Sequence, residues 1–174
     1  MLTVRTTSLA GTHAVAAAIA GLAKGGDLIV LAGEMGAGKT AFAQGFGAAL
    51  GVKEPITSPT FTLVHTYECG PDSGRIDLHH ADLYRLDRTG EVADLALGEL
   101  LESNGIVLVE WGDVLGNTLG DRLVLHLGVG EDDALMSDGG TGSPVRDITI
   151  RPYGSTWARR WGALEAAVDG ATRC

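Results

Sequence analysis

The sequence of 174 residues predicts an α/β fold in which helices flank a sheet, and three observations lead to this prediction. Two apolar runs, Asp27–Ala32 and Gly105–Glu110, have the length and unbroken hydrophobicity of central strands buried on both faces. Segments with helical spacing of apolar residues lie between the strand candidates, an alternation typical of α/β folds. At this length, 45% hydrophobic and 20% charged residues indicate one globular domain over residues 1–174.

The elements of the N-terminal half follow from capping residues, glycines and apolar runs. Thr12 can cap a helix through its hydroxyl, and Gly25-Gly26 can end that helix. The turn residues Pro71–Gly74 separate two strand candidates. The predicted elements are a strand at Leu2–Thr6, a helix from Thr12 to about Lys24, a strand at Asp27–Ala32, a glycine-rich turn at Gly33–Gly38, a helix at Thr40–Leu50, and strands at Phe61–Tyr67 and Arg75–Asp82.

In the C-terminal half, leucines at helical spacing, one more apolar run and one alternating run define the elements. A Gly- and Asp-rich stretch there indicates a mobile loop, and Trp157, Trp161 and Leu164 share one side of the last predicted helix. The predicted elements are a helix at Glu91–Ser103, strands at Gly105–Glu110 and Arg122–Leu127, a loop at 128–144, a returning strand at Val145–Arg151 and a helix at Ser155–Val168.

The net charge of −9 disfavours direct binding of nucleic acid, because the chain lacks the broad positive surface that holds a phosphate backbone. The acidic excess falls almost entirely between residues 68 and 138. The two cysteines suggest neither a metal site nor a disulfide framework, which favours a reducing, cytoplasmic setting. No apolar run approaches the roughly 18 residues of a membrane span, so no membrane association is expected.

The residues Gly33–Thr40 (GEMGAGKT) fit the P-loop pattern G-x-x-x-x-G-K-[ST], between a buried strand and a helix. The glycines let backbone N–H groups converge on phosphate oxygens, and the helix N-terminus adds partial positive charge. Lys39 would reach the β- and γ-phosphates, and the Thr40 hydroxyl would ligate Mg²⁺. The motif therefore predicts a nucleotide-binding domain of the P-loop NTPase type.

A P-loop site needs an acidic partner for Mg²⁺, and Glu110 ends an apolar strand where such a residue belongs. Trp111 follows directly and would either pack near the site or cover the sheet. Thr60, within Ser58–Thr62, lies where switch segments of P-loop proteins lie and could sense the γ-phosphate.

The segment His79–Arg85 places His80 and Asp82 on one face of a predicted strand and His79 on the other. Asp82 could orient a water molecule or assist the metal. A zinc site made by His79, His80 and Asp82 is the alternative, although adjacent histidines on opposite faces argue against it. The guanine-reading Asn-Lys-x-Asp pattern is absent, which favours ATP over GTP even though Asp87–Gly90 matches D-x-x-G.

Together these segments resemble the TsaE (YjeE) family, bacterial ATPases of tRNA threonylcarbamoyladenosine (t6A) synthesis. The resemblance covers roughly residues 12–113 and rests on four blocks in matching order: Leu31–Gly51, Ser58–Tyr67 (SPTFTLVHTY), His80–Leu86 (HADLYRL) and Val109–Asp113 (VEWGD). The second and third blocks make the match specific, because the P-loop alone indicates only a nucleotide.

The resemblance implies a P-loop α/β domain with a mixed sheet flanked by helices, which hydrolyses ATP weakly by itself and acts with TsaD and TsaB. That complex transfers threonylcarbamoyl to the adenosine beside the anticodon, and the TsaE-like subunit resets it by hydrolysis, meeting tRNA only indirectly. The implied roles are a cradle for ATP formed by Gly36, Ala37, Gly38, Lys39, Thr40 and Ala41, Mg²⁺ ligation by Thr40 and Glu110, support of hydrolysis by Asp82, a switch at Thr60 and a place near the nucleotide for Trp111.

Two positions depart from the family pattern. Ala41 replaces a second Thr after the lysine, which removes one hydroxyl contact to phosphate, and Glu34 replaces an Asp. Two other functions stay open: a stand-alone small-molecule kinase, for which Arg159-Arg160 is the one local candidate for a lid, and a nucleotide-gated binding module without relevant turnover.

Overall fold

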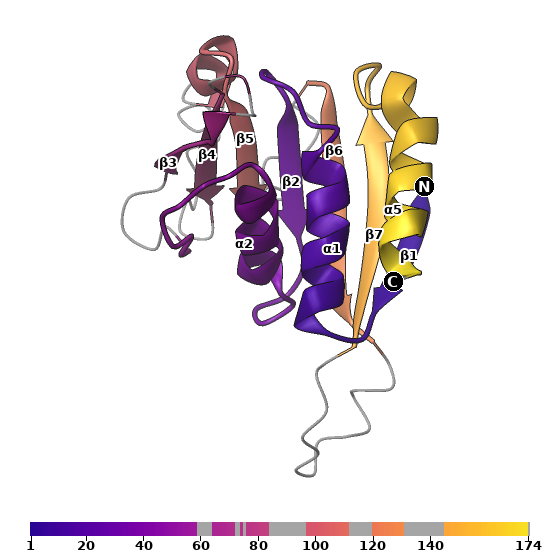
Figure 1. The fold of residues 1–174 in the computed structure, drawn as a ribbon. Helices are drawn as coiled ribbons and strands as arrows, with labels where there is room; N and C mark the ends of the chain where they lie inside the picture. Colours follow the sequence, from indigo (N-terminus) through magenta and orange to yellow (C-terminus); the bar gives the residue numbers. More distant parts are fainter. Residues whose placement is uncertain are drawn as a thin grey trace.

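The seven strands that the structure describes form one sheet in the order β1-β7-β6-β2-β5-β4-β3 (Figure 1). The structure is a computed structural model that describes residues 1–58, 64–71, 74, 76–83, 97–111, 120–130 and 145–173. The strands are β1 (Leu2–Thr6), β2 (Leu28–Ala32), β3 (Val64–Glu68), β4 (Asp77–Asp82), β5 (Ile106–Glu110), β6 (Arg122–Val129) and β7 (Arg146–Tyr153).

The sheet is mixed, as the resemblance implies. The four central strands β6, β2, β5 and β4 run parallel to one another. The pairs β3–β4, β6–β7 and β1–β7 are antiparallel. Every residue of β2 and β5 is buried, because helices or other chain segments cover both faces at the centre.

Three helices, α1 (Leu9–Ala20), α2 (Lys39–Ala49) and α5 (Trp161–Thr172), lie side by side on one face of the sheet, with α1 between the other two (Figure 1). Their apolar side chains join alternate residues of the strands, such as Ile29 and Leu31, in the larger core. The intervening residues Leu28 and Val30 face the smaller core on the other side, where the helical residues 97–102 pack through Leu97. The sheet is therefore covered on both faces, which leaves its carboxyl edge for a site.

The structure corrects both ends of the first predicted helix. Ser8, and not Thr12, caps α1, because the Ser8 hydroxyl accepts a hydrogen bond from the N–H of Gly11 at 3.0 Å. Thr12 lies inside the helix, and its hydroxyl bonds the Thr6 hydroxyl at 3.0 Å, which ties α1 to β1. The helix ends at Ala20, before the Gly25-Gly26 pair.

The predicted helix at Ser155–Val168 is also divided differently. A short 3₁₀ turn, η3 (Ala158–Arg160), precedes α5, which continues to Thr172. Trp157 and Leu164 are buried and Trp161 packs against the same core, which confirms their common side. The residues at the start of the predicted loop 128–144 belong to β6, which ends at Val129. Residues 131–144, 91–96 and 61–63 lie outside the described part of the chain.

In the part of the chain that the structure describes, no helix has the length and hydrophobicity needed to cross a membrane.

Candidate functional site

The segment Gly33–Gly38 connects the carboxyl end of β2 to the N-terminus of α2, as the P-loop pattern requires. Gly33, Gly36 and Gly38 have φ angles of 136°, 79° and 101°, a backbone region that side chains rarely adopt. A Cβ atom on Gly33 would overlap the Leu127 carbonyl oxygen of β6. Gly38 precedes α2 with no side-chain hydrogen bond to cap the helix, and a helix N-terminus of this kind suits an anion.

Lys39 folds back into this loop. Its Nζ donates to the carbonyl oxygens of Gly33 at 2.8 Å and Glu34 at 2.9 Å, and the side chain is almost fully buried. The same ammonium lies 3.8 Å from the centroid of the Trp111 ring. The structure thus brings the Trp111 ring to the P-loop lysine, and Trp111, which follows β5, has a φ angle of 61°.

Thr40 and Glu110 meet at the same edge, because β2 and β5 are parallel neighbours in which Leu31 pairs with Glu110. The Thr40 hydroxyl donates to Glu110 Oε1 at 3.1 Å and lies 3.5 Å from Oε2. Glu110 is 3% exposed. A hydroxyl and a carboxylate next to an anion cradle are the oxygen ligands that a hard divalent cation such as Mg²⁺ prefers. The donor set therefore fits the metal that the sequence predicts.

Asp82 ends β4 opposite Glu110 in the parallel register, so the two carboxylates lie on adjacent strands at one edge. Its Oδ2 accepts a hydrogen bond from the Ser58 hydroxyl at 2.8 Å. That bond brings the start of the Ser58–Thr62 segment to the site. Thr60, the predicted switch residue, lies outside the described residues.

His79 and His80 point to opposite faces of β4, as the strand period predicts. The His79 Nδ1 atom bonds the Thr66 hydroxyl at 2.9 Å, and burial lowers the pKa of His79 against a smaller opposing effect of Asp77. The described residues, which include His79, His80 and Asp82, hold no group of three side chains that could bind a metal in the manner of zinc. The zinc alternative is therefore wrong for these residues.

Two contacts at the site were not predicted from the sequence. His80 Nε2 lies 3.0 Å from Glu110 Oε1, and both side chains are buried. Arg146, the first residue of β7, donates to the Gly36 carbonyl oxygen at 3.3 Å. Both contacts depend on strand order. The sequence signal for His80 is a polar residue in an apolar strand. The signal for Arg146 is a basic residue just after the Gly- and Asp-rich stretch at 128–144.

The arginine pair proposed as a kinase lid lies elsewhere. Arg160 forms an ion pair with Asp27, with Nη2 and Oδ1 2.6 Å apart. Asp27 precedes β2 at its amino end, whereas the P-loop follows the carboxyl end of the same strand. Arg160 therefore cannot close over the phosphate site. The hypothesis of a stand-alone kinase thereby loses its one local candidate for a lid.

Comparison with known proteins agrees with this geometry. Residues 6–134 match the family described as "Threonylcarbamoyl adenosine biosynthesis protein TsaE". A protein of Bacillus subtilis named tRNA threonylcarbamoyladenosine biosynthesis protein TsaE is 39% identical over 115 residues, which cover 66% of this chain and 69% of the relative. The protein of that name in Streptomyces coelicolor is 39% identical over 142 residues, 80% of this chain and 89% of the relative.

A solved structure is similar as well. The crystal structure of YdiB from Bacillus subtilis superposes with a TM-score of 0.69 at 30% identity, over 97% of this chain and 94% of that one. The similarity covers the whole sheet and not the P-loop alone. The fold is that of P-loop nucleotide-binding proteins.

Proposed function

The chain belongs to the TsaE family and thus has a role in the biosynthesis of tRNA threonylcarbamoyladenosine, and we propose that its part in that pathway is Mg²⁺-dependent hydrolysis of ATP. The observation that carries this proposal is the contact between Thr40 and Glu110 beside the N-terminus of α2. This edge of the sheet suits a nucleoside triphosphate with its cation, because it brings together an anion cradle, an ammonium group and a pair of oxygen ligands.

Each residue has a role that follows from its position in the site. The N–H groups of Gly36, Ala37, Gly38, Lys39, Thr40 and Ala41 hold the phosphates, and Thr40 and Glu110 hold Mg²⁺. Bound Mg²⁺ would neutralise charge that develops on the β- and γ-phosphates.

Lys39 leaves the Gly33 and Glu34 carbonyls and pairs with the β- and γ-phosphates, and Trp111 shields that ion pair from water on one side. Asp82 accepts a hydrogen bond from the attacking water and orients it, while Thr60 reports the presence of the γ-phosphate. Ala41 offers only its backbone N–H, so the cradle has one hydroxyl fewer than the usual family pattern.

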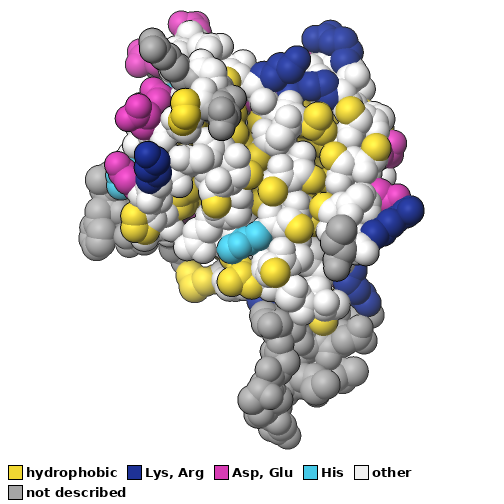
Figure 2. Space-filling model, viewed as in Figure 1, with side chains coloured by type: hydrophobic (Ala, Val, Ile, Leu, Met, Phe, Trp, Pro, Cys, Tyr) yellow, Lys and Arg dark blue, Asp and Glu magenta, His cyan; other side chains and the backbone are white. Residues whose placement is uncertain are grey.

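We place the activity within a complex, in the cytoplasm, with the whole chain acting as one domain. TsaD and TsaB carry out the threonylcarbamoyl transfer, and ATP hydrolysis by this subunit resets them between turnovers. The net charge of −9 supports docking on a basic protein surface and only indirect contact with tRNA. Acidic side chains gather on the side of the molecule where β3 and β4 lie, and the exposed Glu54, Glu68 and Asp77 are in that region (Figure 2).

The test is complementation of a strain that lacks the gene. Lys39→Ala should abolish threonylcarbamoyladenosine in bulk tRNA, measured by mass spectrometry of nucleosides. The reason is that the triphosphate loses the ammonium group that pairs with its β- and γ-phosphates. Lys24→Ala, which changes an exposed lysine near the amino end of β2, is the matched control and should restore modification fully. Normal modification with Lys39→Ala would contradict the proposal.

Trapping the ATP-bound form distinguishes a function that needs ATP hydrolysis from one that needs only nucleotide-gated binding. A complex that needs hydrolysis should stall after about one cycle of modification, whereas a binding module should continue through repeated cycles.

A further inference from the structure

We infer that His80 is a positioning residue for Glu110, one that holds the carboxylate in the orientation from which it binds Mg²⁺; this inference rests on the proposed function. His80 is 0% exposed, and its Nε2 lies 3.0 Å from Glu110 Oε1. The histidine touches neither the P-loop nor the place of the nucleotide in any contact that the structure describes, so it acts through Glu110.

The strand register produces this contact. His80 pairs with Leu108 and Asp82 pairs with Glu110 in the parallel β4–β5 ladder. These four side chains share the face of the sheet that α2 covers, because Leu78 and Leu108 belong to the core on that side. The His80 side chain therefore contacts Glu110 diagonally across the ladder.

Glu110 Oε1 accepts two hydrogen bonds in the described structure, one from His80 and one from Thr40 at 3.1 Å. Its Oε2 is 3.5 Å from the Thr40 hydroxyl. A carboxylate fixed through one oxygen presents the other in a defined direction. Without His80, Thr40 would be the one described side chain that restrains the group, and in the proposed function Thr40 also binds the cation.

The chemistry of the ring supports a role beyond packing. Because a carboxylate only accepts, Nε2 must carry the hydrogen, and Nδ1 has no hydrogen-bond partner among the described residues. A buried polar atom without a partner is destabilising, so an apolar side chain of similar volume would fill the same space at lower cost. The bond to Glu110 is the one polar contact of the ring in the described structure.

The experiment measures binding instead of turnover. A fluorescent ADP is titrated with the full chain in the presence and absence of Mg²⁺, for the wild type and for His80→Leu, which removes the donor at similar volume. The gain in affinity on adding Mg²⁺ should fall by about 10- to 100-fold in His80→Leu, the range for outer partners of metal ligands. The affinity without Mg²⁺ should stay unchanged.

Three further variants make the result specific. His80→Gln places an amide N–H at the same number of bonds from Cα and should restore most of the gain. His80→Asn, which is one bond shorter, should not restore it and provides a second test if His80→Leu folds poorly. His79→Leu changes the neighbouring histidine on the opposite face and should leave the gain unchanged.

A wild-type gain retained in His80→Leu and His80→Asn would overturn this inference alone. If His80→Leu lost ADP affinity equally with and without Mg²⁺, and its unfolding midpoint also fell, the role of His80 would be structural. That result would overturn the inference as well. A wild-type chain that binds ADP with no gain from Mg²⁺ would overturn the proposed function and this inference with it.

Discussion

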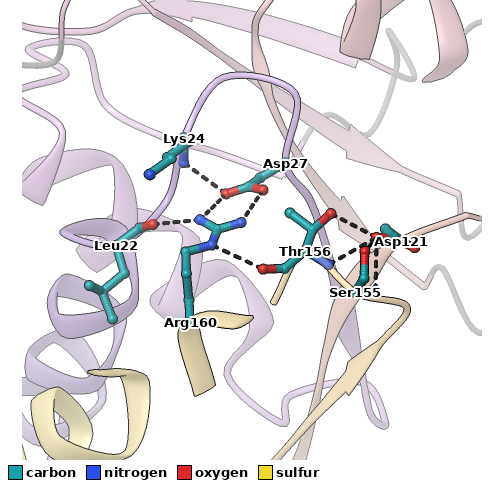
Figure 3. A network of polar contacts seen from close by, with 7 residues as sticks. All are labelled: Leu22, Lys24, Asp27, Asp121, Ser155, Thr156 and Arg160. Carbon is teal, nitrogen blue, oxygen red and sulfur yellow. Dashed lines mark hydrogen bonds and ion pairs between the residues drawn. The ribbon is translucent and has the colours of Figure 1, made fainter. Parts of the chain in front are cut away.

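Asp121 shows how one carboxylate joins two strand ends. Its Oδ2 accepts hydrogen bonds from the N–H groups of Ser155 and Thr156, both at 2.9 Å, and from their hydroxyls at 3.1 and 2.7 Å (Figure 3). These donors, with the Thr156 hydroxyl first, lower the pKa of Asp121 to about 2. Gly154 has a φ angle of 76°, and a Cβ atom there would overlap the Asp121 carboxylate. The start of β6 is thereby fixed to the chain that follows β7.

The lowered pKa of Asp121 predicts acid sensitivity of the fold. The ordinary pKa is 3.8 and the folded value about 2, so the stabilisation is complete above pH 3.8 and is lost as the pH falls toward 2. Asp121→Asn should reduce stability at neutral pH and flatten the pH dependence of the urea midpoint between pH 4 and 2. Glu165→Gln, at an exposed position in α5, is the control and should keep the wild-type profile. An unchanged profile in Asp121→Asn would contradict this assignment.

At the scale of elements, α1 and α2 cross closely because Gly45 has no side chain. A Cβ atom on Gly45 would lie 2.7 Å from the Cα of His13 in α1. The crossing sets where α2 begins and hence where its N-terminus meets the P-loop. His13 has a half-buried side chain, and its Nε2 has no hydrogen-bond partner among the described residues.

Gly45→Ala should lower the free energy of unfolding by about 1–3 kcal/mol, since backbone contact leaves no room for a methyl group. Gly162→Ala in α5 is the matched control, because a Cβ atom there meets nothing within 4 Å. That variant should raise stability by about 0.5–1 kcal/mol through better helix propensity. Urea unfolding measures both, and stabilisation by Gly45→Ala would show that the helices separate freely.

At the scale of the whole molecule, the C-terminal segment is joined to the start of β2 through Arg160 and Asp27. The guanidinium donates to both Asp27 oxygens, at 2.6 and 2.8 Å, and to the Leu22 carbonyl at 2.6 Å (Figure 3). Asp27 Oδ2 also accepts the N–H of Lys24 at 2.8 Å. The Arg160 side chain is 15% exposed and that of Asp27 is 3% exposed, so water screens the pair weakly.

Arg160→Met should reduce the free energy of unfolding by about 3–5 kcal/mol, because it leaves a buried carboxylate without its cation. The double variant Asp27→Asn/Arg160→Met should lose less than the sum of the two single losses. Arg159→Met changes the adjacent exposed arginine and serves as control in the same urea series. Additive losses would show that the two charges are not coupled.

Local patterns allowed much of the site to be predicted. The glycines of Gly33–Gly38 have the backbone angles that their motif demands, and Lys39, Thr40, Glu110 and Trp111 meet there. The alternation of side chains along β4 placed His80 and Asp82 on one face correctly. The helix start at Thr12 was wrong because Ser8 and Thr12 are both good caps, and only packing against β1 selects between them.

The P-loop turn, the two buried strands and the family could all be inferred from sequence, because glycine conformation and side-chain period act over a few residues. Which distant groups meet depends on the folded chain. His80 and Glu110 are 30 residues apart, Gly36 and Arg146 are 110 apart, and Asp27 and Arg160 are 133 apart. These contacts depend on the strand order β7-β6-β2-β5-β4. That order follows from how the whole chain buries its apolar faces, so no short segment encodes it.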